Sequence, residues 1–153
     1  MKIHIPLLLM ITTLTAAHAE PRFSSLFQDH MVLQREQPVP IWGTADAGES
    51  VTVRFASQRQ TTVADAEGAW RVTLDPMPAN PEGRVLEIKG GPRCADVLVG
   101  DVWLLSGQSN MGMGLTQSSG GKETIAAADF PWLRILLTEK VRAEEPRDAF
   151  NGD

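Results

Sequence analysis

The stretch that decides the fold is VLVGDVWLLSGQSNM, residues 97–111. An apolar run leads into a turn of small and polar residues, and the turn carries Ser109 between Gln108 and Asn110. A continuous apolar run is typical of a strand buried on both faces of a parallel sheet, so we predict such a strand over residues 97–105. Ser109 would then lie just past the carboxyl end of that strand, where α/β proteins place their active sites.

The residues of this turn suit nucleophilic catalysis. Gly107 allows a tight bend because it has no side chain. The backbone N–H groups of Ser109 and Asn110 can face a developing oxyanion, and the amides of Gln108 and Asn110 can donate hydrogen bonds without carrying charge. Ser109 is therefore the candidate nucleophile, with Gly107, Gln108 and Asn110 as its oxyanion or substrate region. From spacing alone, a Ser/Asn turn that only bonds the local backbone is the alternative, because Met111 replaces the last glycine of the G-x-S-x-G elbow.

Residues 20–95 contain short segments separated by turn residues at intervals of roughly eight to twelve positions. Apolar and polar residues alternate over residues 51–56 and 70–75, and residues 60–64 can pair back on the first of these segments. This period of two is typical of half-buried antiparallel strands. We therefore predict an antiparallel β-sandwich domain over residues 20–95, with residues 76–83 as a long loop.

The pattern changes at residue 96. After the apolar run and a Gly-rich turn, residues 122–129 predict a short helix, and residues 133–137 predict a second buried strand. Strand, turn, helix and strand in that order indicate the beginning of a doubly wound α/β domain over residues 96–153. The predicted fold class is therefore mixed, with a β-sandwich followed by the first part of an α/β catalytic domain.

Residues 1–19, MKIHIPLLLMITTLTAAHA, have the pattern of a secretory signal peptide. Lys2 supplies the positive charge, an apolar stretch follows, and Ala17 and Ala19 form a small-x-small cleavage site. The apolar stretch is short for a membrane span. We expect a secreted or periplasmic product without stable membrane insertion after cleavage.

The composition excludes some classes of partner. The formal net charge is −5 and no basic residues cluster, so we expect no nucleic-acid binding. The single cysteine, Cys94, cannot form an intramolecular disulfide and has no metal-ligand spacing around it, so we expect a loop thiol and no metal. No histidine follows Ser109, and we interpret His30 as a surface or packing residue. Aromatic residues can stack on sugars, but we expect three of the tryptophans to lie in the core: Trp42, Trp70 and Trp103.

Three sequence blocks occur together in a recognisable order. They are LFQDHMVLQR (26–35), PVPIWG (38–43) followed by AGE (47–49) and VTV (51–53), and DVLVGDVWLLSGQSNM (96–111). Together they resemble the sialate O-acetylesterase family of SGNH-type serine hydrolases, over about residues 23–137. The resemblance implies an N-terminal β-sandwich followed by a flavodoxin-like catalytic domain. It also implies removal of acetyl groups from sialic acid or other glycans, without a metal or organic cofactor.

By this resemblance Ser109 matches the family nucleophile, and its backbone N–H is one oxyanion donor. The Asp-x-x-His that activates the serine, and the Gly and Asn that complete the oxyanion site, belong to later family blocks that are absent from residues 1–153. Gly112 stands where many members have glutamate. We therefore expect a front fragment of an esterase that is inactive alone, because removing the base from such a unit costs several orders of magnitude in rate.

Two other interpretations remain open at this point. One is a non-catalytic β-sandwich module that binds carbohydrate or a protein partner. The other is an acetylesterase that acts on xylan or pectin, because the Gln-Ser-Asn-Met turn is shared among esterases. An in-frame continuation that encodes Asp-x-x-His would favour the esterase over the binding module.

Overall fold

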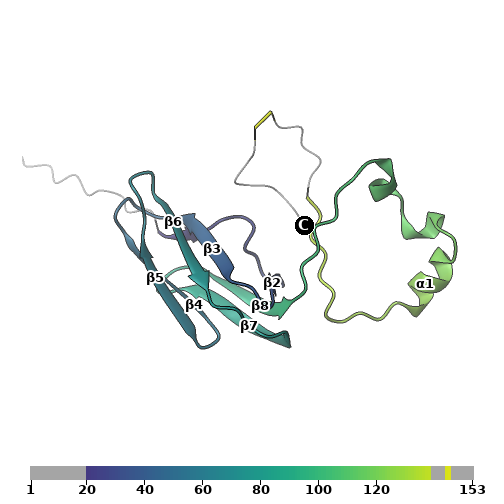
Figure 1. The fold of residues 1–153 in the computed structure, drawn as a ribbon, viewed down its shortest axis with the longest axis horizontal. Helices are drawn as coiled ribbons and strands as arrows, with labels where there is room; N and C mark the ends of the chain where they lie inside the picture. The colour runs from purple at the N-terminus through teal and green to yellow at the C-terminus, as the bar shows by residue number, and fades with distance from the viewer. Residues whose placement is uncertain (1–19, 139–143, 146–153) are drawn as a thin grey trace, which may run out of the picture.

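The structure is a computed structural model that describes residues 20–138 and 144–145, so the expected leader lies outside the described residues. Strands occupy the first part of the chain, and short helices follow (Figure 1). A three-stranded sheet has the order β1 (Arg22–Phe23), β3 (Val39–Thr44), β6 (Ala69–Leu74). A five-stranded sheet has the order β2 (Val32–Gln34), β8 (Arg93–Gly100), β7 (Asn80–Ile88), β4 (Ser50–Phe55), β5 (Gln58–Val63).

The two sheets share one hydrophobic core. Every second side chain of β4 and of β6 is buried, so the alternation predicted for residues 51–56 and 70–75 is confirmed. β4 and β5 form the predicted antiparallel hairpin, with Val53 opposite Gln60. The largest fully buried side chains come from both sheets: Ile41, Val51, Val53, Phe55, Leu74, Leu86, Ile88 and Val97. Burial of this apolar surface is the main force that holds the sheets together.

The expectation of a wholly antiparallel β region is wrong at one pairing. β2 and β8 are parallel, with Val32 opposite Leu98. Alternating polarity shows which face of a strand is buried, but not the direction of its neighbour. The loop expected over residues 76–83 is also partly wrong, because β7 begins at Asn80 and joins β8 through two register shifts. The expected domain boundary after residue 95 falls inside β8, which continues to Gly100.

After β8 the chain leaves the sheets and later returns to them, and we call residues 101–133 the excursion. Figure 1 shows it passing through α1 and coming back as a yellow segment. It contains η1 (Ser109–Gly112), η2 (Leu115–Gln117) and α1 (Gly121–Ala127), which is the predicted helix with slightly different ends. The prediction of a second strand over residues 133–137 is wrong, because no strand follows Gly100 within residues 20–138. Four of the five side chains of residues 133–137 are exposed. Residues 133–137 pair with no strand, and the residue after them, Thr138, forms only an isolated bridge.

Candidate functional site

The candidate nucleophile lies on the excursion. Ser109 is exposed and is the first residue of η1. The N–H of Met111 donates to the carbonyl of Gln108 at 3.0 Å, which closes the turn that carries Ser109. A Cβ built at Gly107 would lie 2.8 Å from Cγ of Met111, a half-exposed side chain that would have to shift to admit it. Gly107, Gln108 and Ser109 therefore form one tight turn, as the sequence suggested, and Asn110 follows in η1.

The strand expected to lead directly to Ser109 is only half correct. Val97, Leu98 and Val99 are buried, but β8 ends at Gly100 and residues 101–108 form no strand. The apolar side chains that follow are exposed, from 53% for Val102 to 94% for Leu104. Trp103 is 80% exposed, so its expected place in the core is wrong. An apolar run shows that side chains favour burial, but it does not show whether a neighbour covers them.

Hydrogen bonds from the end of β2 and from Arg35, the residue after it, hold the point at which the excursion begins. Nε of Arg35 donates to Oδ1 of Asp101 at 2.9 Å, and the N–H of Val102 donates to Oε1 of Gln34, also at 2.9 Å. The backbone N–H of Arg35 donates to the carbonyl of Gly100 at 2.9 Å. The Asp101 carboxylate raises the pKa of the Arg35 guanidinium, chiefly through this hydrogen bond. We call Gln34, Arg35, Asp101 and Val102 the exit clamp.

A second polar group holds the returning chain, and we call its members His30, Asp96 and Arg134 the Asp96 cluster. Oδ2 of Asp96 lies 2.7 Å from Nδ1 of His30 and accepts a 3.1 Å hydrogen bond from Nη2 of Arg134. The hydrogen bond from His30, followed by the contacts with Arg134, lowers the pKa of the Asp96 carboxyl. The cluster therefore ties residue 134, just after the excursion, back to β8.

The Asp96 cluster has an unusual backbone. His30 and Asp96 both have positive φ, 64° and 52°, which is uncommon for residues other than glycine. Gly83 on β7 makes room for the Asp96 side chain, because a Cβ built at Gly83 would lie 2.0 Å from Oδ1 of Asp96. Such strained positions persist only where the surrounding structure holds them.

Sequence reasoning missed both polar groups. Arg35 and Asp101 are separated by 66 positions, and so are His30 and Asp96. The constant separation follows from the parallel register of β2 and β8, in which Val32 also faces Leu98. The one sequence signal for these two polar groups was the joint occurrence of the blocks at residues 26–35 and 96–111. The structure places these blocks side by side.

The described residues offer little other reactive chemistry. Cys94 lies on β8 and is buried, rather than in the expected loop, and burial raises the pKa of its thiol to about 11. The thiol is therefore protonated at neutral pH and is a poor nucleophile. Residues 20–138 and 144–145 contain no group of three or more His, Cys, Asp or Glu side chains that could hold a metal ion.

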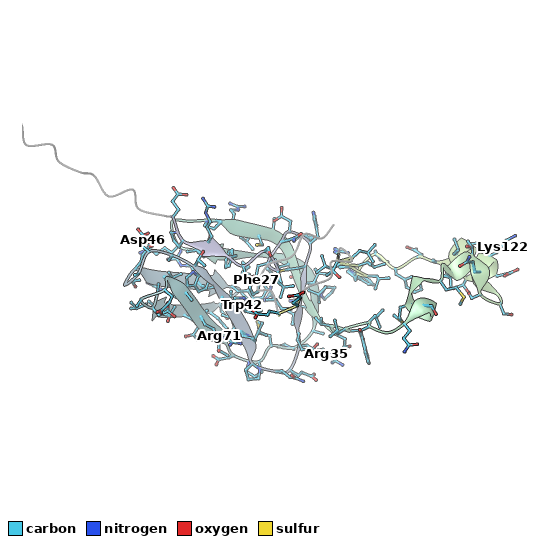
Figure 2. The ribbon with its side chains drawn as sticks, turned by 90° about the horizontal axis from the view of Figure 1, so that it is seen from above. Phe27, Arg35, Trp42, Asp46, Arg71 and Lys122 are labelled. Carbon is cyan, nitrogen blue, oxygen red and sulfur yellow. The ribbon has the colours of Figure 1, made fainter. Side chains whose placement is uncertain are left out.

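The tryptophans of the sheets offer no open stacking face. Trp70 is buried, as expected, and Trp42 packs partly buried against the core. The Phe27 ring meets Trp42 edge-on with centroids 4.8 Å apart, and the guanidinium of Arg71 lies 5.8 Å from the centroid of Trp42 (Figure 2). Sugar stacking on Trp42 would have to displace one of these neighbours.

The cavities near the sheets do not include Ser109. One of about 1140 Å³ lies between the segment that contains β1 and residues 90–94, which comprise a turn and the start of β8, and Leu137 also lines it. A second cavity of about 770 Å³ is lined in part by Trp42 and Trp70. Over the part of the chain that the structure describes, no helix has the length and apolar character needed to cross a membrane.

Comparison with known proteins identifies the relatives of this chain. No protein-family model matches it. The sialate O-acetylesterases of Mus musculus and Homo sapiens are each 36% identical to it, over matches that cover 83% and 81% of this chain. A solved carbohydrate acetylesterase from Xanthomonas citri superposes with a TM-score of 0.76 at 38% sequence identity, and the match covers 86% of this chain. The chain matches one part of the sialate O-acetylesterases.

The family match spans only part of each relative. It covers 26% of the mouse and human sialate O-acetylesterases and 31% of the solved Xanthomonas citri chain. A continuous match over 81% of the 153 residues includes residues 35–120 wherever it begins. The part that this chain shares with the sialate O-acetylesterases therefore contains Arg35, Asp101 and Ser109.

Proposed function

We propose that this chain is the nucleophile-bearing part of a carbohydrate esterase that removes acetyl groups from sugar hydroxyls, with Ser109 as the nucleophile. One observation carries the proposal. Relatives named sialate O-acetylesterase and a solved protein named carbohydrate acetylesterase both match more than four fifths of the chain at 36–38% identity. Both names describe acetyl ester hydrolysis on sugars, so the general reaction is better supported than the particular sugar.

The proposed chemistry is acyl transfer. Oγ of Ser109 attacks the acetyl carbonyl while a base takes its proton, the sugar hydroxyl leaves, and water then releases acetate from the acyl-enzyme. The first N–H groups of a helix have no partner inside it, so the N–H groups of Ser109 and Asn110 at the start of η1 are suited to face the oxyanion. The exposed position of Ser109 leaves its hydroxyl open to an ester.

The proposed reaction also needs a base to accept the proton of Ser109, and the described residues place no such base beside it. Within the described residues, Oγ of Ser109 has no hydrogen-bond partner, and His30 is the only histidine, with Nδ1 bonded to Asp96. We propose that the base comes from the Asp-x-x-His block that the family resemblance implies, outside residues 1–153. Residues 20–153 alone are then expected to be inactive. The leader pattern of residues 1–19 supports a secreted or periplasmic location.

The test uses the complete reading frame that contains this sequence, expressed without residues 1–19. Acetate release is measured from 9-O-acetylated sialic acid, acetylated xylan and acetylated pectin, with Ser109→Ala and residues 20–153 as comparisons. We expect acetate release by the complete protein, and a fall of at least about 1000-fold in kcat for Ser109→Ala. Equal rates for wild type and Ser109→Ala would refute the nucleophile, and absence of release from all three substrates would refute the esterase. Preference for xylan or pectin would keep the reaction but change the substrate.

A further inference from the structure

We propose that the exit clamp is a positioning device: Gln34 and Arg35 fix the direction in which the chain leaves β8 and thereby place Ser109 for attack. The proposal rests on the proposed function of Ser109. Gln34 and Arg35 are not part of the turn itself, and they belong to the sequence block at residues 26–35 rather than to the block that contains Ser109.

The geometry of the exit clamp fixes three consecutive residues. Arg35, the first residue after β2, bonds the carbonyl of Gly100 and the carboxylate of Asp101, and Gln34 at the end of β2 accepts from the N–H of Val102, each at 2.9 Å. Three anchors on successive residues define both the position and the direction of the departing chain. Arg35 supplies two of the anchors, one from its backbone N–H and one from its guanidinium.

Beyond the clamp, little else holds the segment that leads to Ser109. Within the described residues, no other hydrogen bond joins residues 101–107 to the rest of the protein. The side chains of Val102, Trp103 and Leu104 are 53–94% exposed, so core packing does not fix their positions. Among the described residues, the exit clamp is therefore the hydrogen-bonded link that joins the segment leading to Ser109 to the sheets.

The two ends of the excursion are held by the same pair of strands. The exit clamp joins the segment at the end of β2 to the first residues after β8, and the Asp96 cluster joins Arg134 to β8 and to the segment before β2. Figure 2 labels Arg35 at the end of the sheets from which the excursion departs, and Lys122 at the distant end of the excursion. Both ends of the excursion are therefore tied to the sheets by polar contacts.

A positioning role predicts a particular kinetic signature. Displacing a nucleophile by about 1 Å can cost about 100-fold in rate, because attack needs aligned atoms. Exposed ion pairs contribute little to global stability, and the side chains of Arg35 and Asp101 are 37% and 54% exposed. Loss of the clamp should therefore lower kcat while the melting temperature and KM stay nearly unchanged.

The variants are Arg35→Ala, Gln34→Ala, Asp101→Ala and Asp101→Asn in the complete protein. Asp101→Asn keeps an oxygen acceptor for Nε of Arg35, so it should recover most of the activity that Asp101→Ala loses. The matched control is Arg54→Ala, which removes an arginine of similar exposure (43%) whose ion pair with Glu87 lies within the five-stranded sheet. Each variant is assessed by Tm, by kcat and KM for an acetylated sugar, and by amide hydrogen exchange at Val102.

We expect Arg35→Ala and Asp101→Ala to lower kcat about 10- to 100-fold with KM within about twofold, and Arg54→Ala to change neither. Gln34→Ala should accelerate exchange at Val102 at least about tenfold, because it removes the acceptor of that N–H. An unchanged kcat in Arg35→Ala, a fall in kcat that tracks a fall in Tm, or no recovery in Asp101→Asn would overturn the proposal. If the wild-type protein releases no acetate, the proposed function fails, and the exit clamp is then tested by amide hydrogen exchange at Val102 alone. Unchanged hydrogen exchange at Val102 in both Gln34→Ala and Arg35→Ala would overturn the exit clamp.

Discussion

Asp101, the first residue after β8, accepts a hydrogen bond of 2.9 Å from Arg35, the first residue after β2. The two strands are parallel, so both chains leave the sheet at the same end. The contact joins two sequence blocks that lie far apart in the chain and that together carry its family resemblance. The segment that leads to Ser109 therefore begins at a fixed polar contact rather than at a buried strand end.

The first prediction concerns the charge state of Asp96. We expect its carboxyl pKa to lie below the ordinary aspartate value of about 3.9, chiefly because the hydrogen bond with His30 favours the charged form. A pKa that is lower in the folded state stabilises the fold above the unfolded value, and that contribution is lost as pH falls through the folded value. A ¹³C carboxyl titration by NMR measures the pKa directly.

The controls for Asp96 separate its two partners. His30→Ala and Arg134→Ala should each raise the pKa of Asp96, because the hydrogen bond with His30 is the largest single cause of the shift and the contacts with Arg134 act in the same direction. Arg54→Ala should leave the pKa of Asp96 unchanged. A titration of Asp96 that does not respond to His30→Ala would show that the two side chains are not paired in solution.

The His30 contact also shows where sequence reasoning stops. His30 was interpreted as a surface or packing residue, and its side chain is indeed 67% exposed. Its partner Asp96 is separated from it by 66 positions, and only the parallel pairing of β2 with β8 brings the two together. A local pattern does not contain that information, because parallel strands are joined by a crossover of a dozen or more residues and therefore pair segments that are distant in the sequence.

The half-buried strands were predictable because the evidence for them is local in the sequence. In β6 the buried residues Trp70, Val72 and Leu74 alternate with exposed ones, so the sequence itself records that one face meets a core. Residues 102–105 are just as apolar but remain exposed in the described structure. Hydrophobicity alone therefore predicted Trp70 correctly and Trp103 wrongly, because burial also depends on whether another element covers the side chain.

The second prediction concerns Gly83. A Cβ at this position would lie 2.0 Å from Oδ1 and 3.0 Å from Cα of Asp96, so Gly83→Ala should force β7 and β8 apart. We expect a loss of about 1–3 kcal/mol in the free energy of unfolding, measured by urea denaturation. Gly114→Ala is the control, because the nearest atom to its new Cβ lies 3.7 Å away, and it should be close to neutral. Similar stabilities for the two variants would contradict the close approach of Asp96 to β7.

The third prediction concerns the thiol of Cys94. Burial raises its pKa to about 11, so the reactive thiolate is scarce at pH 8. We expect a thiol reagent such as DTNB to label the native protein at least about 100-fold more slowly than the urea-unfolded protein. Because the folded pKa is raised, the thiol stabilises the fold fully below its unfolded pKa, and this contribution declines as pH rises towards 11. Rapid native labelling at pH 8 would place Cys94 in an open loop instead of β8.

The fourth prediction tests the exposed apolar segment of the excursion in residues 20–153. Trp103 and Leu104 are 80% and 94% exposed, so Trp103→Ser and Leu104→Ser should change the free energy of unfolding by less than about 0.5 kcal/mol. Exposed apolar side chains in sequence form a surface that binds hydrophobic dyes and other protein molecules. Both variants should therefore bind less ANS and aggregate more slowly than the parent chain.

The matched control for this segment is Trp70→Ser in the core. Trp70 is 3% exposed, and truncating a buried tryptophan typically costs about 3–5 kcal/mol. We expect Trp70→Ser to lower the unfolding midpoint sharply, while Trp103→Ser leaves it in place. If Trp103→Ser instead destabilised the chain as much as Trp70→Ser, Trp103 would be packed in a core in solution. The apolar run over residues 97–105 would then have to continue as a buried strand towards Ser109, as the sequence first suggested.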